Sequence, residues 1–222
     1  MKNILLLIFL LVVFFAKSSF ALIEIDVTRG NLTPLPVAVS PLHVESKSSE
    51  VLKEIEVGLE ISKIIETNLL RSGLFNPLEK DSFVQKPDIA HLKPRFEDWK
   101  LIKAQALITG KVKITDDKLR VEFRLWDVLA AKEMMALSFT TVPNNWRRVS
   151  HIITDKIYQR LTGEEGYFDT RIIYVSEKGP KNRRIKKLAI MDQDGANTKY
   201  LTLGNELVLT PRFNPTNQMV TY

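Results

Sequence analysis

The sequence has 222 residues, 45% of them hydrophobic and 26% charged, which is typical of a folded globular protein and excludes a disordered one. Its formal net charge of +6 is mildly basic and does not by itself indicate a nucleic-acid partner. The sequence contains no cysteine, which excludes disulfides, thiolate metal sites, a thiol nucleophile and a lipidated cysteine anchor.

Residues 1–21 have the pattern of a signal peptide. Lys2 supplies a positive charge, residues 4–16 form an unbroken apolar run, and Ser19-Phe20-Ala21 places small residues where a signal peptidase reads them. The apolar run is shorter than the roughly 18 residues that span a bilayer. We therefore expect cleavage after Ala21, with an uncleaved anchor as the alternative, and a mature chain that works outside the cytoplasm.

The next segment alternates between apolar and polar residues. It comprises Leu22, Ile23, Glu24, Ile25, Asp26, Val27 and Thr28. In an extended strand Ile23, Ile25 and Val27 would share one face. The segment can be an ordinary edge strand or a free amino-terminal strand that pairs with the sheet edge of a partner. The pattern alone favours the ordinary strand.

Helical and extended patterns follow over residues 34–165. Residues 37–39 indicate a short buried strand, and apolar spacing predicts a long helix over residues 49–72, capped by Ser48 or Ser49 and ended by Gly73. A shorter helix is predicted over residues 95–103.

Three strands are then predicted, over residues 106–114, 119–126 and 135–139. The middle strand alternates cleanly, which indicates a meander with one buried face. We therefore expect an α/β domain with a mixed sheet and flanking helices.

Residues 146–175 join this domain to another kind of structure. Apolar residues recur at helical spacing from Val149 to Leu161, Asn144 or Asn145 can cap the start, and Gly163 fits a left-handed end. Short strands are then predicted over residues 171–176, 187–191, 199–202 and 219–222. Strands at this even spacing indicate a sandwich or propeller blades, but there are too few to close any β architecture.

The histidines are the first candidates for chemistry. His151 and Asp155 lie four residues apart and could form an acid–base pair, but Ser150 points about 100° away on a helix, so no triad results. A packing or surface role for His151 is therefore favoured. His43 and His91 are isolated in the sequence, so no metal site is expected.

Residues 192–197 place oxygen-bearing side chains at alternate positions, as a calcium loop does. The acid that such a loop needs at its twelfth position is missing, because Leu203 stands there, so a hairpin turn is favoured. A basic run lies between two predicted strands and comprises Lys178, Lys181, Arg183, Arg184, Lys186 and Lys187. A solvated loop is favoured, attraction to an anionic surface is the alternative, and the absence of interleaved aromatic residues argues against nucleic acid.

Several ordered motifs resemble the TolB family. They are Trp146-Arg147-Arg148 with the helix and strand that follow, Leu125-Trp126-Asp127, residues 191–197, and Leu207 with residues 210–213. The resemblance implies an amino-terminal α/β domain followed by a six-bladed β-propeller. It also implies a periplasmic, non-enzymatic component of the Tol-Pal system, which maintains outer-membrane integrity, helps constrict that membrane at division and is exploited for colicin import.

The family resemblance also implies partners. Pal would bind mainly through the propeller and TolA through the mature amino-terminal strand, so residues 22–28 become the expected partner-binding strand. No catalytic residue, cofactor, metal, nucleic acid or small-molecule substrate is expected. The residues of the domain junction are assigned to domain packing, and they are Trp146, Arg147, His151, Asp155, Tyr158, Gly163, Phe168 and Asp169.

One departure from the family concerns the propeller. The family pattern would continue far past Tyr222, and the blade-entry turn reads Asn214-Pro215-Thr216-Asn217 where the family usually has Ser-Pro-Asp-Gly. We therefore expect the product of a truncated or split gene, or a fragment, with about one blade and the opening strand of a second, and with Pal binding in doubt. The expected boundaries are 1–21, 22–33, 34–165 and 166–222. A secreted propeller-linked hydrolase is the alternative function, and RNA binding conflicts with export.

Overall fold

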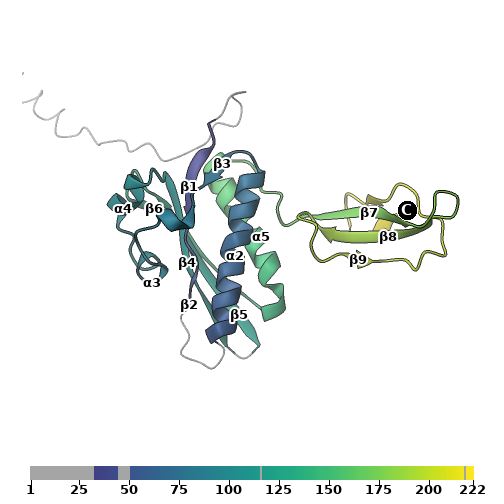
Figure 1. Cartoon of the computed structure of the whole chain (residues 1–222), viewed down its shortest axis with the longest axis horizontal. Helices are drawn as coiled ribbons and strands as arrows, with labels where there is room; N and C mark the ends of the chain where they lie inside the picture. Colours follow the sequence, from purple (N-terminus) through teal and green to yellow (C-terminus); the bar gives the residue numbers. More distant parts are fainter. Residues whose placement is uncertain (1–32, 45–50, 116, 218) are drawn as a thin grey trace, which may run out of the picture.

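The computed structural model describes residues 33–44, 51–115, 117–217 and 219–222 (Figure 1). The predicted signal peptide, the predicted partner-binding strand and the predicted helix cap at Ser48 or Ser49 lie outside these residues. No helix in the described ranges is long and apolar enough to cross a membrane.

Six strands form one mixed sheet in the first part of the chain. They are β1 (Leu35–Val39), β2 (His43–Val44), β3 (Phe75–Pro77), β4 (Ala106–Thr115), β5 (Lys118–Asp127) and β6 (Lys132–Thr141). Their order is β3-β1-β4-β5-β6, with β2 also paired to β4. β1 is parallel to β3 and β4, whereas β4, β5 and β6 form an antiparallel meander. The sheet is mixed, as the sequence predicted.

Two long helices cover one face of this sheet. α2 (Val51–Arg71) and α5 (Trp146–Thr162) lie side by side (Figure 1), and Gly73 follows α2 with a φ of 74°. They enclose the larger core with alternate residues of β5, which are Leu119, Val121, Phe123 and Leu125. Each of these is at most 1% exposed, so the predicted buried face of the meander is confirmed.

The other face of the sheet carries a smaller core. α4 (Phe96–Leu101) places Trp99 against Leu107 and Trp126, which point away from the larger core. The sequence predicted this helix but not the short elements around it. Those are η1 (Lys80–Ser82) and α3 (Pro87–Ala90), together with strands β2 and β3.

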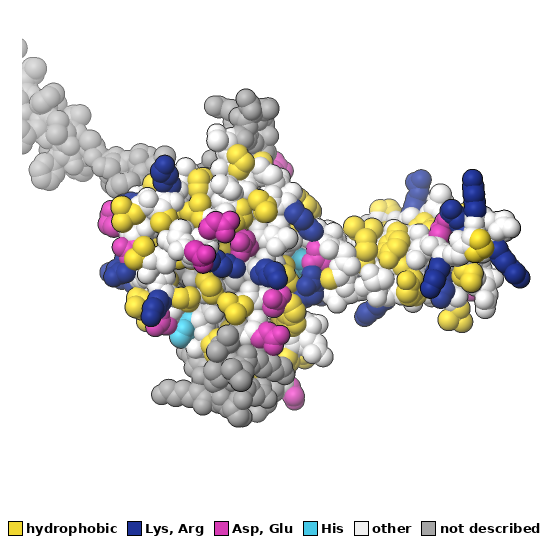
Figure 2. Space-filling view, in the orientation of Figure 1, with side chains coloured by type: hydrophobic (Ala, Val, Ile, Leu, Met, Phe, Trp, Pro, Cys, Tyr) yellow, Lys and Arg dark blue, Asp and Glu magenta, His cyan; other side chains and the backbone are white. Residues whose placement is uncertain are grey.

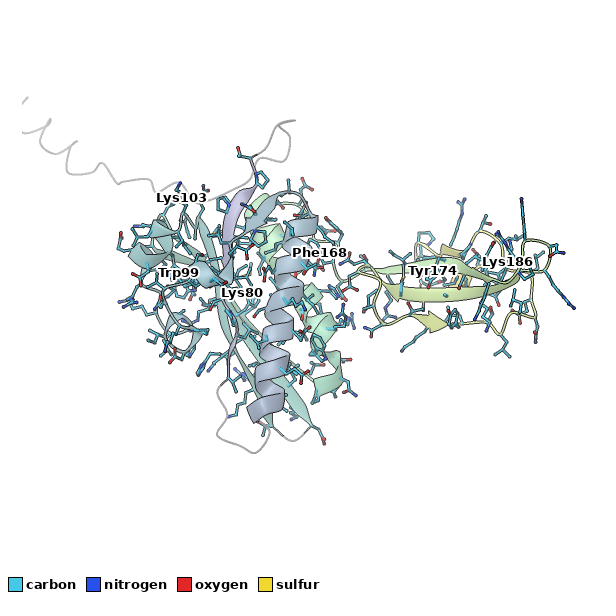
Figure 3. All side chains as sticks on the ribbon, in the orientation of Figure 1. Lys80, Trp99, Lys103, Phe168, Tyr174 and Lys186 are labelled. Carbon is cyan, nitrogen blue, oxygen red and sulfur yellow. The ribbon has the colours of Figure 1, made fainter. Side chains whose placement is uncertain are left out.

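The second part of the chain is built of strands alone. β7 (Arg171–Lys178), β8 (Ile185–Asp192) and β9 (Lys199–Tyr200) form an antiparallel sheet, and β10 (Arg212–Phe213) pairs with β11 (Val220–Thr221). β9 is shorter than the predicted 199–202 because Thr202 turns its hydroxyl to accept a hydrogen bond from the Leu188 N–H, at 2.9 Å. This sheet extends away from the α/β domain, with Phe168 at the near end and Lys186 towards the far end (Figures 1 and 3).

Candidate functional site

Helix α5 carries most of the residues assigned to the junction. Val149, Ile153, Ile157 and Leu161 recur every four residues and face the larger core, with Trp146 and Tyr158 packed at its margin. Gly163 ends the helix at φ 77° and its N–H donates to the Gln159 carbonyl, as predicted.

The predicted cap at the start of α5 is wrong. Residues Pro143–Asn145 wind into a 3-10 turn (η2), and no side chain caps the helix there. The Asn145 amide instead donates to Thr141 Oγ1 at 3.1 Å, because the 3-10 turn directs it back towards the end of β6.

Asp155 holds the segment that leaves α5. Its Oδ1 accepts a hydrogen bond from the Phe168 N–H at 2.6 Å, and its Oδ2 accepts one from the Asp169 N–H at 3.1 Å. Gly166 passes so close that a Cβ there would lie 2.4 Å from the Asp155 Cα. Asp155 therefore positions the linker and forms no pair with His151.

Aromatic rings fill the space beside this linker. Phe168 is buried, and it packs edge-on against Tyr158 with ring centroids 5.7 Å apart and stacks on Tyr167 at 4.5 Å. Figure 3 places Phe168 where the linker leaves the α/β domain. Burial, followed by the neighbouring Tyr167 and Glu164, raises the pKa of Tyr158. The phenol therefore stays neutral, and the linker is anchored by apolar packing as well as by Asp155.

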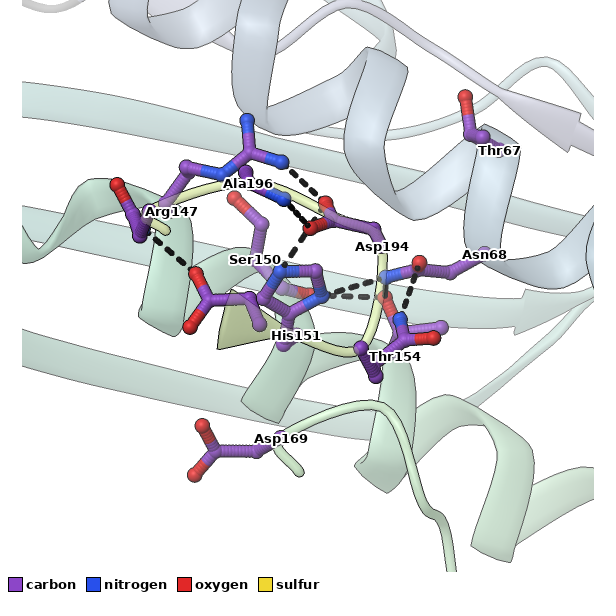
Figure 4. Close-up of polar contacts among 12 residues, drawn as sticks. Thr67, Asn68, Arg147, Ser150, His151, Thr154, Asp169, Asp194 and Ala196 are labelled. Atoms are coloured by element: carbon purple, nitrogen blue, oxygen red, sulfur yellow. Dashed lines mark hydrogen bonds and ion pairs between the residues drawn. The ribbon is translucent and has the colours of Figure 1, made fainter. Parts of the chain in front are cut away.

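The turn between β8 and β9 reaches back to α5. It is a hairpin, as predicted, with Gly195 at φ 87° and its N–H donating to the Asp192 carbonyl. Asp194 accepts a hydrogen bond from the Ala196 N–H at 3.1 Å and forms an ion pair with Arg147 (Figure 4). The oxygen-bearing side chains that suggested calcium are thus used in the turn and the junction.

His151 is buried at the centre of this contact. Its Nδ1 lies 2.9 Å from the Asn68 side-chain amide, and its Nε2 lies 3.5 Å from Asp194 Oδ2 (Figure 4). Arg71 can only donate, and it donates to Asn68 Oδ1, so the Asn68 amide must present its NH2 group to the imidazole. His151 is therefore neutral, with its proton on Nε2 facing Asp194.

A second set of contacts links α2 to the same turn. Gln193 Nε2 donates to Asn68 Oδ1 at 3.1 Å, and Gln193 Oε1 accepts from Arg71. Asn68 also donates to Thr154 Oγ1 at 3.3 Å. Both long helices, α2 and α5, thus hold the tip of the β8–β9 turn.

The pKa values at the junction follow from these contacts. Burial lowers the pKa of His151, and the positive charge of Arg147 lowers it further, while Asp194, Asp192 and Asp169 act in the opposite direction. Burial raises the pKa of Asp194, but the Ala196 N–H, Arg147 and His151 together bring it below its ordinary value. The preferred state is a neutral His151 beside an ionised Asp194.

A polar pocket of about 320 Å³ lies next to this contact. Arg148 borders it and forms a bidentate pair with Asp169, with all three N–O distances at 3.2 Å. The remaining lining residues come from both sides of the junction, and they include Asn144, Asn145, Arg147, His151, Thr170, Arg171, Asp192, Asn197 and Lys199.

The comparisons with known proteins agree along the chain. The model of the TolB amino-terminal domain matches residues 23–134, and the model of the TolB beta propeller domain matches residues 158–222. The chain belongs to the TolB family. It is 73% identical over 219 residues to the Tol-Pal system protein TolB of Pelagibacter ubique (strain HTCC1062), covering 97% of this chain and 49% of that protein.

A solved structure shows the same fold. The crystal structure of TolB from Acinetobacter baumannii is 27% identical, with a TM-score of 0.65, over 82% of this chain and 41% of that one. The chain thus spans about half the length of the curated TolB relative, and its second part is a portion of a propeller.

Five of the eight predicted junction residues of this TolB chain fall into three groups. Arg147 and His151 meet at Asp194, Asp155 and Phe168 anchor the linker, and Asp169 binds Arg148. Sequence reasoning missed Asn68, Arg71, Gln193 and Asp194 as partners in the junction. Only the polar Asn68 in the middle of an apolar helical stripe signalled a buried contact, and it named no partner.

The same contacts disfavour metal binding and catalysis at these residues. His151, Asp192 and Asp194 bring one ligand atom each within 4.8 Å of one another. However, Arg147 occupies the Asp194 carboxylate, and the His151 Nε2 that would bind a metal carries a proton. Ser150 donates its hydroxyl to the Trp146 carbonyl, so these residues supply neither a built metal site nor a nucleophile.

His43 and His91 are not isolated as the sequence suggested. Their rings stack with centroids 4.3 Å apart, and His91 Nδ1 lies 3.0 Å from the Pro87 carbonyl oxygen. The α3 turn brings His91 to β2, which explains why two residues 48 positions apart in sequence meet.

Proposed function

We propose that this chain is a non-enzymatic component of a Tol-Pal system that acts in the periplasm through protein–protein contacts. The single observation that carries the proposal is 73% identity to a Tol-Pal system protein TolB along 97% of the chain. The role would be in outer-membrane integrity and in drawing that membrane inward at cell division, with protein import such as that of colicins as a use made of the system.

Each segment of the chain would have its own task. Residues 1–21 would be the signal peptide, 22–33 the partner-binding segment, 34–165 the α/β domain and 166–222 the propeller portion. The junction residues would hold the last two segments in one relative orientation. The network around Asn68, His151 and Asp194 supports this, because its hydrogen bonds and ion pairs link both helices to the β8–β9 turn.

TolA is the proposed partner of residues 22–28. A strand that pairs through its backbone takes its specificity from alternate side chains, so its two faces should contribute unequally. The test is a pull-down of the exported chain with the carboxy-terminal domain of TolA. Deleting residues 22–30 should abolish capture, and serine at Ile23, Ile25 and Val27 should weaken it.

A matched control replaces the other face, with Glu24→Gln, Asp26→Asn and Thr28→Ser. The first two changes preserve side-chain size and the third removes one methyl group, so capture should be nearly unchanged. Capture that survives the deletion would remove the proposed role of the segment, and equal loss in both triple variants would argue against one-sided strand pairing.

Pal is the second proposed partner, through the propeller portion. A propeller sheet without neighbouring blades leaves bare strand edges. We therefore expect these 222 residues to capture Pal more weakly than the Pelagibacter ubique relative does in a parallel pull-down. Equal capture would show that residues 166–222 already hold the whole binding surface.

A further inference from the structure

The basic charge of the chain is concentrated in one short segment. Residues 177–187 contain four lysines, two arginines and one glutamate, which gives them a net charge of +5. The whole chain has a net charge of +6, so the other 211 residues together are almost neutral. A charge distribution this uneven is not explained by solubility, which needs only a dispersed surplus.

The fold presents this segment at the end of a hairpin. Lys178 pairs with Ile185 across β7 and β8, and the Arg183 N–H donates to the Pro180 carbonyl in the connecting loop. All residues from 178 to 185 are exposed. Lys and Arg side chains project around this far end of the molecule, away from the α/β domain (Figure 2).

The salt bridges described at this end use only two of its six basic groups. Within residues 177–187 Glu177 is the one residue with a carboxylate, which Arg184 and Lys186 share. Adjacent strands lie about 4.8 Å apart, so neighbouring charges across the hairpin fall within about one Debye length, roughly 10 Å at 0.1 M salt. They therefore act together on an approaching anion.

The geometry points to an anionic phospholipid surface as the partner of this basic hairpin, defined as residues 177–187. A hairpin end with exposed side chains on both strands can touch a plane with several of them at once. The segment contains no aromatic side chain on which a base could stack, which disfavours nucleic acid. Ile185, 53% exposed, adds an apolar contact among the charges.

Vesicle binding tests this inference independently of the Tol-Pal role. The exported chain, with its leader removed in the host, is sedimented with vesicles of phosphatidylglycerol and phosphatidylcholine, and with vesicles of phosphatidylcholine alone. Binding should require the anionic lipid and should fall steeply between about 0.1 M and about 1 M salt. The triple variant Lys178→Gln, Lys181→Gln and Arg183→Gln should bind on the order of 100-fold more weakly.

The matched control removes three exposed lysines elsewhere, with Lys93→Gln, Lys113→Gln and Lys132→Gln. It makes the same change in net charge and should alter binding less than about threefold, because distant charges are screened. Native-like binding by the hairpin variant, or equal binding to neutral vesicles, would overturn the inference. Binding to a single-stranded oligonucleotide without vesicle binding would overturn it in favour of nucleic acid.

Discussion

Arg147 and Asp194 form an ion pair that joins the first turn of α5 to the β8–β9 turn. Asp194 also faces the neutral ring of His151, so one carboxylate holds two groups of the helix. The side chains of Arg147 and Asp194 are 25% and 11% exposed, which limits screening by water. The orientation of the two sheets therefore depends on these polar contacts as well as on the packing of Phe168 at the linker.

Breaking this pair should loosen the junction. Arg147→Ala and Asp194→Ala should each lower the free energy of unfolding by about 2 kcal/mol, because the partner charge is left partly buried. The double variant should lose less than the sum of the two, with a coupling of about 1–3 kcal/mol. Denaturant titration of the native chain, the two single variants and the double variant measures this coupling.

The exposed Arg148–Asp169 pair provides a control. The Arg148 side chain is 62% exposed, so Arg148→Ala should lower the free energy of unfolding by less than about 1 kcal/mol. If Arg148→Ala and Arg147→Ala had equal effects, burial at the junction would not be the cause.

Acidification should destabilise the junction through His151. Its pKa is lowered on folding, so the unfolded chain binds more protons between the folded value and the ordinary value of about 6.5. The stabilisation is complete above about pH 6.5 and is lost as the pH falls towards the folded pKa. The slope for this one group cannot exceed about 1.4 kcal/mol per pH unit.

The test compares free energies of unfolding between about pH 7 and pH 5. His151→Gln should remove the slope that His151 contributes, whereas His91→Gln should retain it. Asp194 responds in a separate pH range. Because its pKa is lowered on folding, it stabilises the fold above its ordinary pKa of about 3.9, and this stabilisation is lost only as the pH falls below that value. A slope unchanged in His151→Gln would place the titrating group elsewhere.

The sequence predicted elements whose pattern depends on local geometry. The alternation of β5 and the left-handed Gly163 are examples, because a sheet face or a helix end imposes them directly. The cap at Asn145 failed because a 3-10 turn competed for the same residues. For the strands after Phe168, the spacing alone fitted either a β-sandwich or propeller blades. The family motifs favoured the propeller.

The junction contacts could not be predicted in the same way. Asp194 belonged to an Asp-Gly turn, and nothing in its neighbours indicates that the turn folds back on α5. His151 and Asp155 share helical spacing, yet Asn68 and Asp194 bind the first, and two linker N–H groups bind the second. Spacing indicates which side chains can meet on one helix, whereas tertiary packing decides which do.

The contacts of Asp155 with the linker should make stability depend on small changes in either partner. Gly166→Ala would place a methyl group against the backbone of Asp155 and should destabilise the chain by about 1–3 kcal/mol. Asp155→Ala should cost a similar amount, because two backbone N–H groups lose their acceptor. Asp155→Asn keeps one acceptor oxygen and should fall between native and Asp155→Ala in thermal unfolding. Equal loss in the two Asp155 variants would show that the charge, not the hydrogen bonds, holds the linker.

The propeller portion should exchange its amide hydrogens faster than the α/β domain does. Within the described chain the two core clusters contain no residue beyond Leu161, and the buried apolar residues after Phe168 are Leu188, Ala189 and Val208. Few buried contacts mean a low free energy of local opening, so β7 and β8 should exchange at least about 100-fold faster than β4 and β5.

Limited proteolysis should leave a resistant core that ends between Gly163 and Phe168. Leu188→Ala should speed exchange in β7 and β8 alone, whereas Leu107→Ala, which opens a cavity in the smaller core, should lower protection in β4 and β5 by about 2–5 kcal/mol. Equal protection in both sheets, or a protease-resistant fragment that reaches Tyr222, would show that the propeller portion unfolds together with the α/β domain.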